Sequence, residues 1–486
     1  MGFSLFDYIV LCLYFLILVC IGSWFSKKQR DIKDYFLGGR SIPWIIISIS
    51  IVATETSALT FIGVPAISFI SDFSFIQLAF GYLIARIILS LTLIKRYYYG
   101  EYYTPYSFLN FRFGREVKNF VGILFFITRI LASGVRLYAI SLVLSVITGI
   151  SIYWSIVIIG ITAVLYTYLG GITAVIWTDV IQMGMLILGG LFSLFVLADK
   201  IPGGLCHIIK TGFSTGKFKF LDFSLDFSIP YSFFAGVIGG TIFGMASHGT
   251  DQSLVQRILT AKNYRGSRNA LVLSGILIIP QFLLFLFIGV MLFIFYQNNR
   301  LDIPLSEADR IFPSFIVNEI GRGLSGLIIA GVFSAAMSSL DSALNALAST
   351  TIADFYIPYS SGKKTDKEIL KISRLLTLFW GGILIGFAFI SILFRNWGSV
   401  LEIGLSVASF TYGSMLGIFL LGMSSCKFNS RVIIFSACSG ILFVIFIRVF
   451  TGIAWPWFAV IGCLTTVFIS FLFNLVSNYG RGKSSV

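Results

Sequence analysis

The segment at residues 331–350, GVFSAAMSSLDSALNALAST, carries hydroxyl groups and one carboxylate within an otherwise apolar stretch. Helical periodicity places four small residues on one face, at spacing i, i+3, i+4 and i+7: Ala335, Ser338, Ser339 and Ser342. A backbone carbonyl and hydroxyls on one face are hard oxygen donors that suit an alkali cation, although small residues also make packing seams between helices. Asp341 favours the cation, because a carboxylate inside a membrane span is costly and usually functional.

Asp179 is a second carboxylate in apolar surroundings. Gly170 and Gly171 are expected to make a tight turn, which puts Asp179 about two turns into the next helix. At that depth an unpaired carboxylate would be neutral or bound to a cation. The structural alternative is a hydrogen bond to the end of a neighbouring helix.

Glu55 stands between two threonines in VATETSALTFIGVPAIS, residues 52–68. This polar cluster, followed by Gly63 and Pro65, predicts an interrupted helix whose free carbonyls could face a cation. Glu55 could balance the charge of that cation, contact a solute, or pair with an arginine of another helix.

Two arginines, Arg129 and Arg136, lie seven residues apart in FFITRILASGVRLYAIS and therefore share one helical face. Either could pair with Glu55 and fix helix positions as a buried ion pair. One of them could equally bind an anionic group of a solute through a bidentate contact. Arg86, near the end of its apolar segment, is expected to reach out to the lipid headgroups.

The elements that position these groups are membrane-spanning helices. Of the 486 residues, 57% are hydrophobic and only 12% are charged, whereas a soluble protein carries roughly 25% charged residues. A spanning helix needs about 20 mostly apolar residues. The sequence predicts an all-α polytopic membrane protein with about 13 transmembrane helices, at residues 4–26, 42–69, 73–94, 118–149, 152–172, 174–198, 231–251, 268–298, 323–355, 370–395, 398–425, 430–450 and 455–477.

The net charge of +14 lies in short segments between the apolar runs, as expected of cytoplasmic loops rather than of a nucleic-acid surface. The charge distribution predicts an extracellular N-terminus and a cytoplasmic C-terminus, in the plasma (inner) membrane. The six cysteines form no CxxC pair, and two histidines are too few for a metal site. No nucleophile–base pair is recognisable, so we expect no enzyme.

Interrupted helices at matching positions predict an internal inverted repeat. The glycine-rich span FAGVIGGTIFGMASHGTD, residues 234–251, is expected to be the second interrupted helix, with close helix packing as the alternative reason for its glycines. The predicted organisation is a first helix and cytoplasmic loop at 1–41, repeat 1 at 42–198, an extracellular loop at 199–230, repeat 2 at 231–425, and two C-terminal helices with a short cytoplasmic tail at 426–486.

Five segments in order resemble the sodium/solute symporter family: DYFLGGRSIPW at 34–44, LYTYLGGITAVIWTDVIQ at 165–182, GTDQSLVQRILTAKN at 249–263, AAMSSLDSALNALAST at 335–350 and FTYGSMLGIFLLG at 410–422. The resemblance covers roughly residues 5–475. It implies a leucine-transporter-like core of five plus five inverted-repeat helices. It also implies uptake of a small solute, driven by sodium through alternating access.

The resemblance implies a sodium site made by groups on the first and eighth core helices: Ala53, Thr56, Ala335, Ser338 and Ser339. In the sialic acid carriers of this family a second sodium is held at positions that match Asp179, Ser338, Asp341 and Ser342. Position 341 is a hydroxyl residue in those carriers and an aspartate here, so the geometry of a second site stays open.

The solute contacts of the family fall on positions that match Glu55, Ser57, Thr60, Phe75, Gln77 and either Arg129 or Arg136. Glu55 matches neither the proline carriers, which have an aspartate there, nor the sialic acid carriers, which have a threonine, so the solute stays unassigned. The expected function is sodium-coupled import of a small polar or anionic organic solute by a monomer in the lipid bilayer, with no nucleic-acid partner. A proton-coupled symporter of the same fold and a transporter-derived solute sensor are the alternatives.

Overall fold

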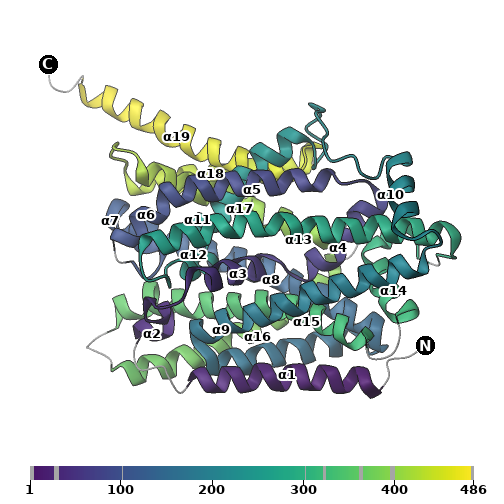
Figure 1. Cartoon of the computed structure of the whole chain (residues 1–486). Coiled ribbons are helices and arrows are strands. Elements are labelled where there is room, and N and C mark those ends of the chain that lie inside the picture. Colours follow the sequence, from purple (N-terminus) through teal and green to yellow (C-terminus); the bar gives the residue numbers. More distant parts are fainter. Residues whose placement is uncertain are drawn as a thin grey trace.

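The computed structural model describes residues 5–26, 32–100, 102–301, 303–320, 324–360, 365–394 and 400–482. Within these ranges the chain is a bundle of long, roughly parallel helices (Figure 1). Among the described residues, nine helices are long and apolar enough to cross a membrane, and a bent pair makes a tenth. Two shorter apolar helices, Leu5–Leu18 and Ile152–Leu165, and the helix around residues 235–250 fall on the remaining expected spans. Each of the expected apolar segments therefore contains a helix.

The first half of the chain contains α1 (Leu5–Ser26), α2 (Ile32–Leu37), α3 (Trp44–Glu55), α4 (Ala58–Ile70), α5 (Gln77–Leu91), α6 (Leu93–Tyr99), α7 (Pro105–Phe113), α8 (Arg115–Thr148), α9 (Ile152–Lys200) and α10 (Gly204–Ser214). The second half contains η3 (Ala235–Gly239), α11 (Gly240–Thr250), α12 (Gln252–Ile258), α13 (Tyr264–Asn298), α14 (Ile311–Glu319), α15 (Leu324–Thr350), α16 (Asp366–Ser391), α17 (Val400–Met423), α18 (Ser430–Phe450) and α19 (Pro456–Gly482). Short 3-10 or π turns flank them at Gly38–Arg40, Ser74–Ile76, Leu305–Arg310, Thr351–Tyr356, Ile357–Tyr359 and Ile392–Phe394.

The first expected interruption is present. The axes of α3 and α4 differ by 64°, and the connecting Thr56 and Ser57 are extended rather than helical. The tight turn at Gly171 is also confirmed. Its φ of 57° and ψ of −176° are not helical, and they divide the long element α9 into two helices. Pro65 lies inside α4 without ending it.

The prediction of a second interrupted helix is wrong. The glycine-rich segment continues as a π turn, η3, followed directly by α11, and regular helix ends only at Asp251. Its glycines serve close packing instead. A Cβ on Gly81 of α5 would lie 2.4 Å from the Gly236 carbonyl, and one on Gly236 would lie 2.8 Å from the Gln77 Cβ atom. The alternative reason for these glycines, small residues at a helix–helix seam, therefore holds.

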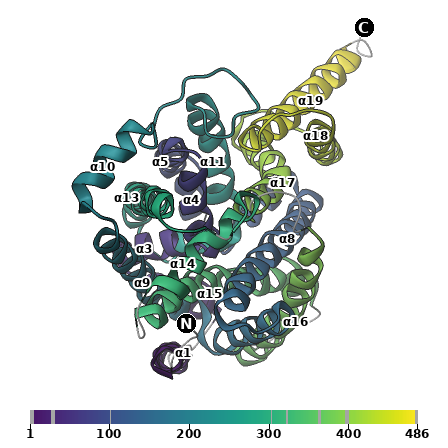
Figure 2. The same ribbon diagram turned by 90° about the vertical axis from the view of Figure 1, so that its right-hand side faces the viewer.

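The two termini of the helical bundle lie at opposite ends: α1 begins at the right-hand end in Figure 1, and α19 ends at the left. Seen along the helix axes, α3, α4 and α15 lie towards the centre, whereas α1, α9, α16, α18 and α19 lie at the periphery (Figure 2). Residues of α15 are almost wholly buried, since 94% of its spanning window is covered by protein. The helix that carries the serine face is thus a central one.

The half-helix α4 is held in place on one side and at its C-terminal end. On one side it packs against α13, where the Ser68 hydroxyl donates to the Leu286 carbonyl at 2.7 Å. At its C-terminal end the buried ammonium group of Lys217 donates to the carbonyls of Phe69 at 2.6 Å and Ser71 at 2.8 Å. A lysine beside these last carbonyls satisfies groups that the end of a helix leaves unpaired.

Gly289 of α13 sets how closely α13 approaches α4. A Cβ there would lie 2.0 Å from the Ser68 Oγ and 2.1 Å from the Pro65 carbonyl oxygen. We therefore expect Gly289→Ala to lower the stability of the purified protein by about 1–3 kcal/mol through overpacking. The matched control is Gly386→Ala on α16, where a Cβ meets nothing within 4 Å. Melting temperatures of both variants in one detergent test this, and equal melting temperatures would contradict the packing argument.

Candidate ion and solute site

The break between α3 and α4 leaves backbone groups free in the middle of the bundle. The amide of Ser57 donates to the Thr60 hydroxyl at 3.4 Å, and the Ser57 hydroxyl accepts from the Leu59 amide at 3.2 Å. Ser57 and Thr60 thus form a capping box at the start of α4. Since the Ser57 amide points there, the Ala53 carbonyl receives no backbone hydrogen bond from the residues described around the break.

The serine face of α15 lies against this break. The Ser339 hydroxyl is 3.2 Å from the Thr54 carbonyl and 3.3 Å from the Ala335 carbonyl, so that it joins the end of α3 to α15. On the other side of the break, Gln281 of α13 donates to the Thr56 hydroxyl at 2.6 Å. Backbone and hydroxyl oxygens from α3 and α15 are thereby collected in one buried place.

Asp179 gathers four helices around one carboxylate. It accepts from Ser338 of α15 and from Ser50 of α3, each at 2.5 Å. It is also ion-paired with Arg257 of α12 at 3.0 Å, and both side chains are fully buried. Arg257 bonds Ser342 as well. The positions expected to form a second cation site are thus brought together, with a guanidinium of the chain itself among them.

Asp341 lies next to this cluster rather than in its centre. It is fully buried, and its carboxylate accepts from the Ser342 hydroxyl at 3.2 Å. The Ser338 carbonyl is a second acceptor within reach of the same Ser342 proton. Asp341 is therefore connected to the Asp179 cluster through Ser342.

Glu55 pairs with Arg86 of α5 and not with Arg129 or Arg136. His248 of α11 is 3.1 Å from the Arg86 guanidinium and 3.8 Å from the Glu55 carboxylate. The expectation that Arg86 reaches the headgroups is wrong: its side chain is fully buried, because a carboxylate within the bundle holds it there. The Glu55 side chain keeps 17% exposure, so part of it still faces open space.

The two arginines of α8 have different surroundings. Arg129 is 3% exposed, is ion-paired with Asp251, and donates to the Tyr412 hydroxyl at 3.2 Å. Arg136 is half-buried and has no ion pair among the residues that the structure describes. Glu55 and Asp251 both act on it electrostatically. Of the two, Arg136 is the one with a guanidinium that is not already engaged.

Phe75 and Gln77, two further positions expected to contact a solute, are used for packing. Phe75 is 3% exposed and stacks edge-on against the rings of Tyr231 and Phe282. The Gln77 amide donates to the Tyr231 carbonyl at 2.7 Å and accepts from the Asp222 amide at 3.3 Å. In this conformation neither side chain faces a space that a solute could occupy.

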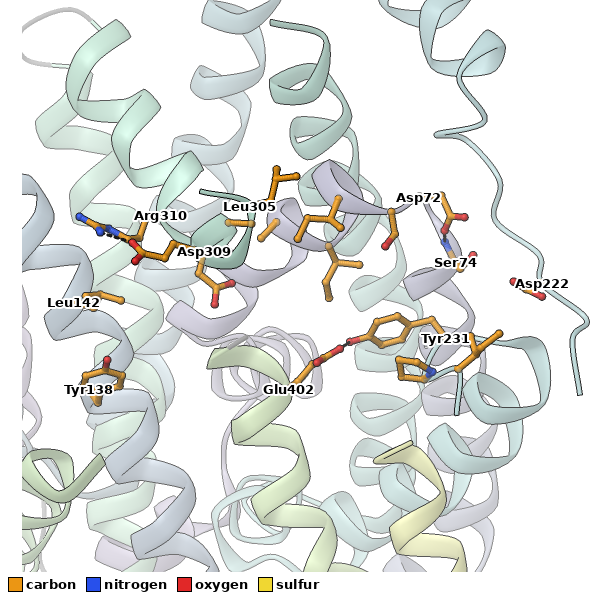
Figure 3. Close-up of a pocket in the computed structure, with 18 of the residues that line it drawn as sticks. Asp72, Ser74, Tyr138, Leu142, Asp222, Tyr231, Leu305, Asp309, Arg310 and Glu402 are labelled. Atoms are coloured by element: carbon orange, nitrogen blue, oxygen red, sulfur yellow. Dashed lines mark hydrogen bonds and ion pairs between the residues drawn. The ribbon is translucent and has the colours of Figure 1, made fainter. Parts of the chain in front are cut away.

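A large cavity of about 1340 Å³ lies at the end of the bundle where α4 terminates. Figure 3 shows Asp309 and Glu402 directed into it, and Tyr231 bonded to Glu402 at 3.2 Å across it. Acidic side chains dominate its charged lining: Asp72, Asp222, Glu307, Asp309 and Glu402, against one base, Arg310. The 13 residues of α4 span about 20 Å. The cavity and the break therefore lie at opposite ends of that half-helix.

Comparison with known proteins identifies this arrangement. The sodium:solute symporter family matches residues 35–440. The chain belongs to this family. It is 30% identical over 479 residues to a sodium/sialic acid symporter of Proteus mirabilis, which covers 96% of this chain and 94% of the relative. The chain is also 29% identical to a protein of Drosophila melanogaster named "Putative sodium-dependent multivitamin transporter", over 87% of this chain and 72% of that protein.

The solved structures agree with this assignment. The substrate-bound, outward-open state of a Na+-coupled sialic acid symporter superposes with a TM-score of 0.88 at 27% identity, over 97% of this chain and 98% of the other. Mhp1, a nucleobase-cation-symport-1 family transporter, shares the fold alone, with a TM-score of 0.59 at 16% identity. The fold is the leucine-transporter-like fold that the sequence predicts, and this symporter is sodium-coupled; the comparisons give no support to the proton-coupled alternative.

Sequence reasoning missed three groups that organise the site: Arg257, Asp251 and His248. All three lie in or beside GTDQSLVQRILTAKN, a segment that the sequence assigns to the family resemblance alone. The signal was present, because two opposite charges six residues apart in an apolar region both need partners. Their partners, Asp179 and Arg129, were already candidates for chemistry.

The two α8 arginines should differ in their effect on stability. Arg129→Met leaves the Asp251 carboxylate buried without its cation, which costs about 3–5 kcal/mol. Arg136→Met breaks no ion pair and should leave the melting temperature nearly unchanged. Thermal unfolding of both variants in one detergent checks this, and an equal loss of stability in the two would show that Arg136 has a structural role too.

Proposed function

We propose that this sodium-coupled symporter carries a small organic anion, and that Arg136 binds the anionic group. The charges around the break in α3–α4 support this. Arg86 is offset by Glu55, and Arg129 is offset by Asp251. Arg136 forms no ion pair with the residues that the structure describes, and it adds one positive charge in a region where water is scarce. An uncompensated guanidinium attracts a carboxylate strongly there, because both charges are poorly screened.

The names of several relatives are consistent with an anionic cargo. They include sodium/sialic acid symporters and a sodium-coupled monocarboxylate transporter of Xenopus laevis, 29% identical over 90% of this chain. Glu55, with its partly exposed carboxylate, would accept hydrogen bonds from hydroxyl or amide groups on the same solute. Ser57 and Thr60 lie on the same break, so that they would join the solute site if α4 tilts.

The acidic cavity suits the ion more than the solute. Its carboxylates raise the local concentration of sodium and lower that of an anion. Since these charges are exposed to water, salt at physiological strength screens them over about 8 Å. An anionic solute can therefore still pass, and the solute site proper is the break beyond the cavity.

For sodium we propose a site between the break and α15, made by the carbonyls of Ala53, Thr56 and Ala335 and the hydroxyls of Ser338 and Ser339. The free carbonyl of Ala53 and the Ser339 bridge to α3 support it. Binding there would fix the break, so that the solute site forms only with sodium present. Alternating access then moves both to the other side, in the orientation with the N-terminus outside and the C-terminus in the cytoplasm.

A second sodium at Asp179, Ser338, Asp341 and Ser342 would have to share Asp179 with Arg257. Two cations on one buried carboxylate are unfavourable unless Arg257 turns away. We therefore propose that one sodium drives the cycle in the state described, and that a second can bind only after Arg257 leaves Asp179.

Ser339 provides the sharpest test of the sodium site, since its hydroxyl bonds only backbone carbonyls of α3 and α15 among the described residues. Ser339→Ala should raise the sodium concentration for half-maximal uptake by about 5–150-fold, as expected for a lost oxygen ligand worth ~1–3 kcal/mol. Uptake into proteoliposomes over a sodium series measures this. The control is Ser436→Ala on α18, whose hydroxyl bonds its own helix at Val432. An unchanged sodium requirement for Ser339→Ala would remove Ser339 from the site.

The solute class is tested by a thermal-shift screen of carboxylic acids, sialic acids, neutral sugars and amino acids, with sodium and with choline in its place. Sodium-dependent stabilisation should appear among the carboxylic or sialic acids. Arg136→Gln should weaken the apparent affinity for that acid about 10–100-fold, as expected for a lost charge-assisted contact, and Arg136→Lys should weaken it less. A neutral solute that stabilises Arg136→Gln as well as the parent would overturn the proposed anion.

A further inference from the structure

The helix α10 exposes an apolar face that no part of the described chain covers. Leu205, Ile209 and Phe213 are 50%, 47% and 69% exposed, and their spacing of four residues places them along one side. On the adjoining side Ile208 is fully buried, and Phe218 packs against Gly212. The described chain thus covers one side of the apolar surface of α10 and leaves the other side exposed.

The remaining side of α10 is polar. His207, Lys210, Thr211 and Ser214 follow one another around the helix, on the side opposite to Leu205 and Ile209. An apolar face with a cationic polar face is the pattern of a helix that lies in a membrane–water interface. A fully aqueous helix would not gain from three large exposed apolar side chains.

The orientation of α10 fits that environment. It runs across the axes of the spanning helices at the end of the bundle where α4 and α14 lie (Figure 1), and it lies on the perimeter, outside α9 and α13 (Figure 2). It contacts both of these helices. A helix at the end of the spans and parallel to the membrane plane is at the depth of the headgroups.

The neighbouring helix α9 also exposes apolar side chains. On α9, which directly precedes α10, Leu188, Leu191 and Phe195 are 45%, 37% and 64% exposed along one side. Because α9 spans the membrane, these three side chains contact acyl chains. Leu205, Ile209 and Phe213 are likewise exposed, on a helix that contacts α9.

We propose that α10 is an interfacial helix, whose Leu205, Ile209 and Phe213 insert among the phospholipids of the leaflet at that end of the bundle. Lys210 and His207 then face the headgroups and water. This contact has a structural consequence, because Lys217 and Phe218 follow α10 within four residues. Lys217 holds the end of α4, and Phe218 stacks on Phe73 and Phe287. The bilayer thus braces the outer half of the broken helix through one short loop.

Bromolipid quenching tests the contact in the full-length protein. A tryptophan is introduced by Phe213→Trp, or by Ser214→Trp as the matched control on the neighbouring polar side. Each variant is reconstituted in phosphatidylcholine with brominated acyl chains. The signal is the difference from the parent, which has eight tryptophans of its own. The added fluorescence at position 213 should be strongly quenched, and that at position 214 should remain several-fold brighter.

Unquenched fluorescence at both positions would place α10 in water, and equal quenching at both would remove the distinction between the two faces; either result would overturn the proposal. Quenching at position 213 that fades as the protein-to-lipid ratio rises would also overturn it, since a second copy would then cover the face. Labelling provides an independent measurement if a tryptophan variant fails to fold. In a Cys206→Ser background, Ile209→Cys should react with a membrane-impermeant maleimide several-fold more slowly than Lys210→Cys. Equal rates would contradict the inserted face.

Discussion

A charge buried within a membrane protein must be compensated, and this requirement organises the centre of the bundle. Three carboxylates there each meet an arginine from another helix: Glu55 with Arg86, Asp251 with Arg129, and Asp179 with Arg257. Pairs of this kind add little net stability over an apolar core, but breaking one is costly. They therefore act as constraints that fix which helices meet, and in this fold they connect α3 to α5, α8 to the end of α11, and α9 to α12.

Because these charges are paired, the unpaired backbone groups at the break between α3 and α4 are the polar groups there that still need a partner. Carbonyls that no amide satisfies are tolerated at membrane depth only where they line a cavity or bind something. The Ala53 carbonyl lies at the end of α3 and the Ser339 hydroxyl lies on α15. Ser339 bonds the Thr54 carbonyl of α3, whereas the Ala53 carbonyl receives no backbone hydrogen bond from the described residues around the break. A cation between them would satisfy both at once, so that closing the break and binding the ion become one event. Coupling of ion and solute then requires no further device.

The fold could be predicted almost entirely from the sequence, whereas the site could be predicted only in part. The spans follow from runs of apolar residues, the turn at Gly171 from its glycine pair, and the break before α4 from the polar cluster around Glu55, whereas Gly63 and Pro65 lie inside α4. The helical periodicity of 335–342 likewise determined its face. Glu55 and Arg86, which form an ion pair, lie 31 residues apart in the sequence, and Asp179 and Arg257 lie 78 residues apart. Local patterns do not carry such pairings. The glycines between residues 236 and 249 led to a wrong prediction of an interrupted helix for a related reason, because close helix packing and unwound backbone both favour glycine.

The short helix α12 shows how these constraints bear on movement. Asp251 at its start binds Arg129 of α8 and the Tyr412 hydroxyl of α17 at 2.6 Å, while Arg257 near its end binds Asp179 of α9. Between them Gln256 donates to the Phe36 carbonyl of α2 at 2.8 Å and accepts from Asn345 of α15 at 3.3 Å. Seven residues thus contact helices on several sides of the bundle. A rigid-body movement of α8 and α17 relative to α9 and α15 would therefore have to open or carry along the bonds that α12 makes to these helices. Since a buried ion pair resists opening, α12 either moves as a unit with one group or exchanges Arg257 for another cation at Asp179. By the second route, the cation bound at Asp179, either Arg257 or another, would depend on the conformation of the whole bundle.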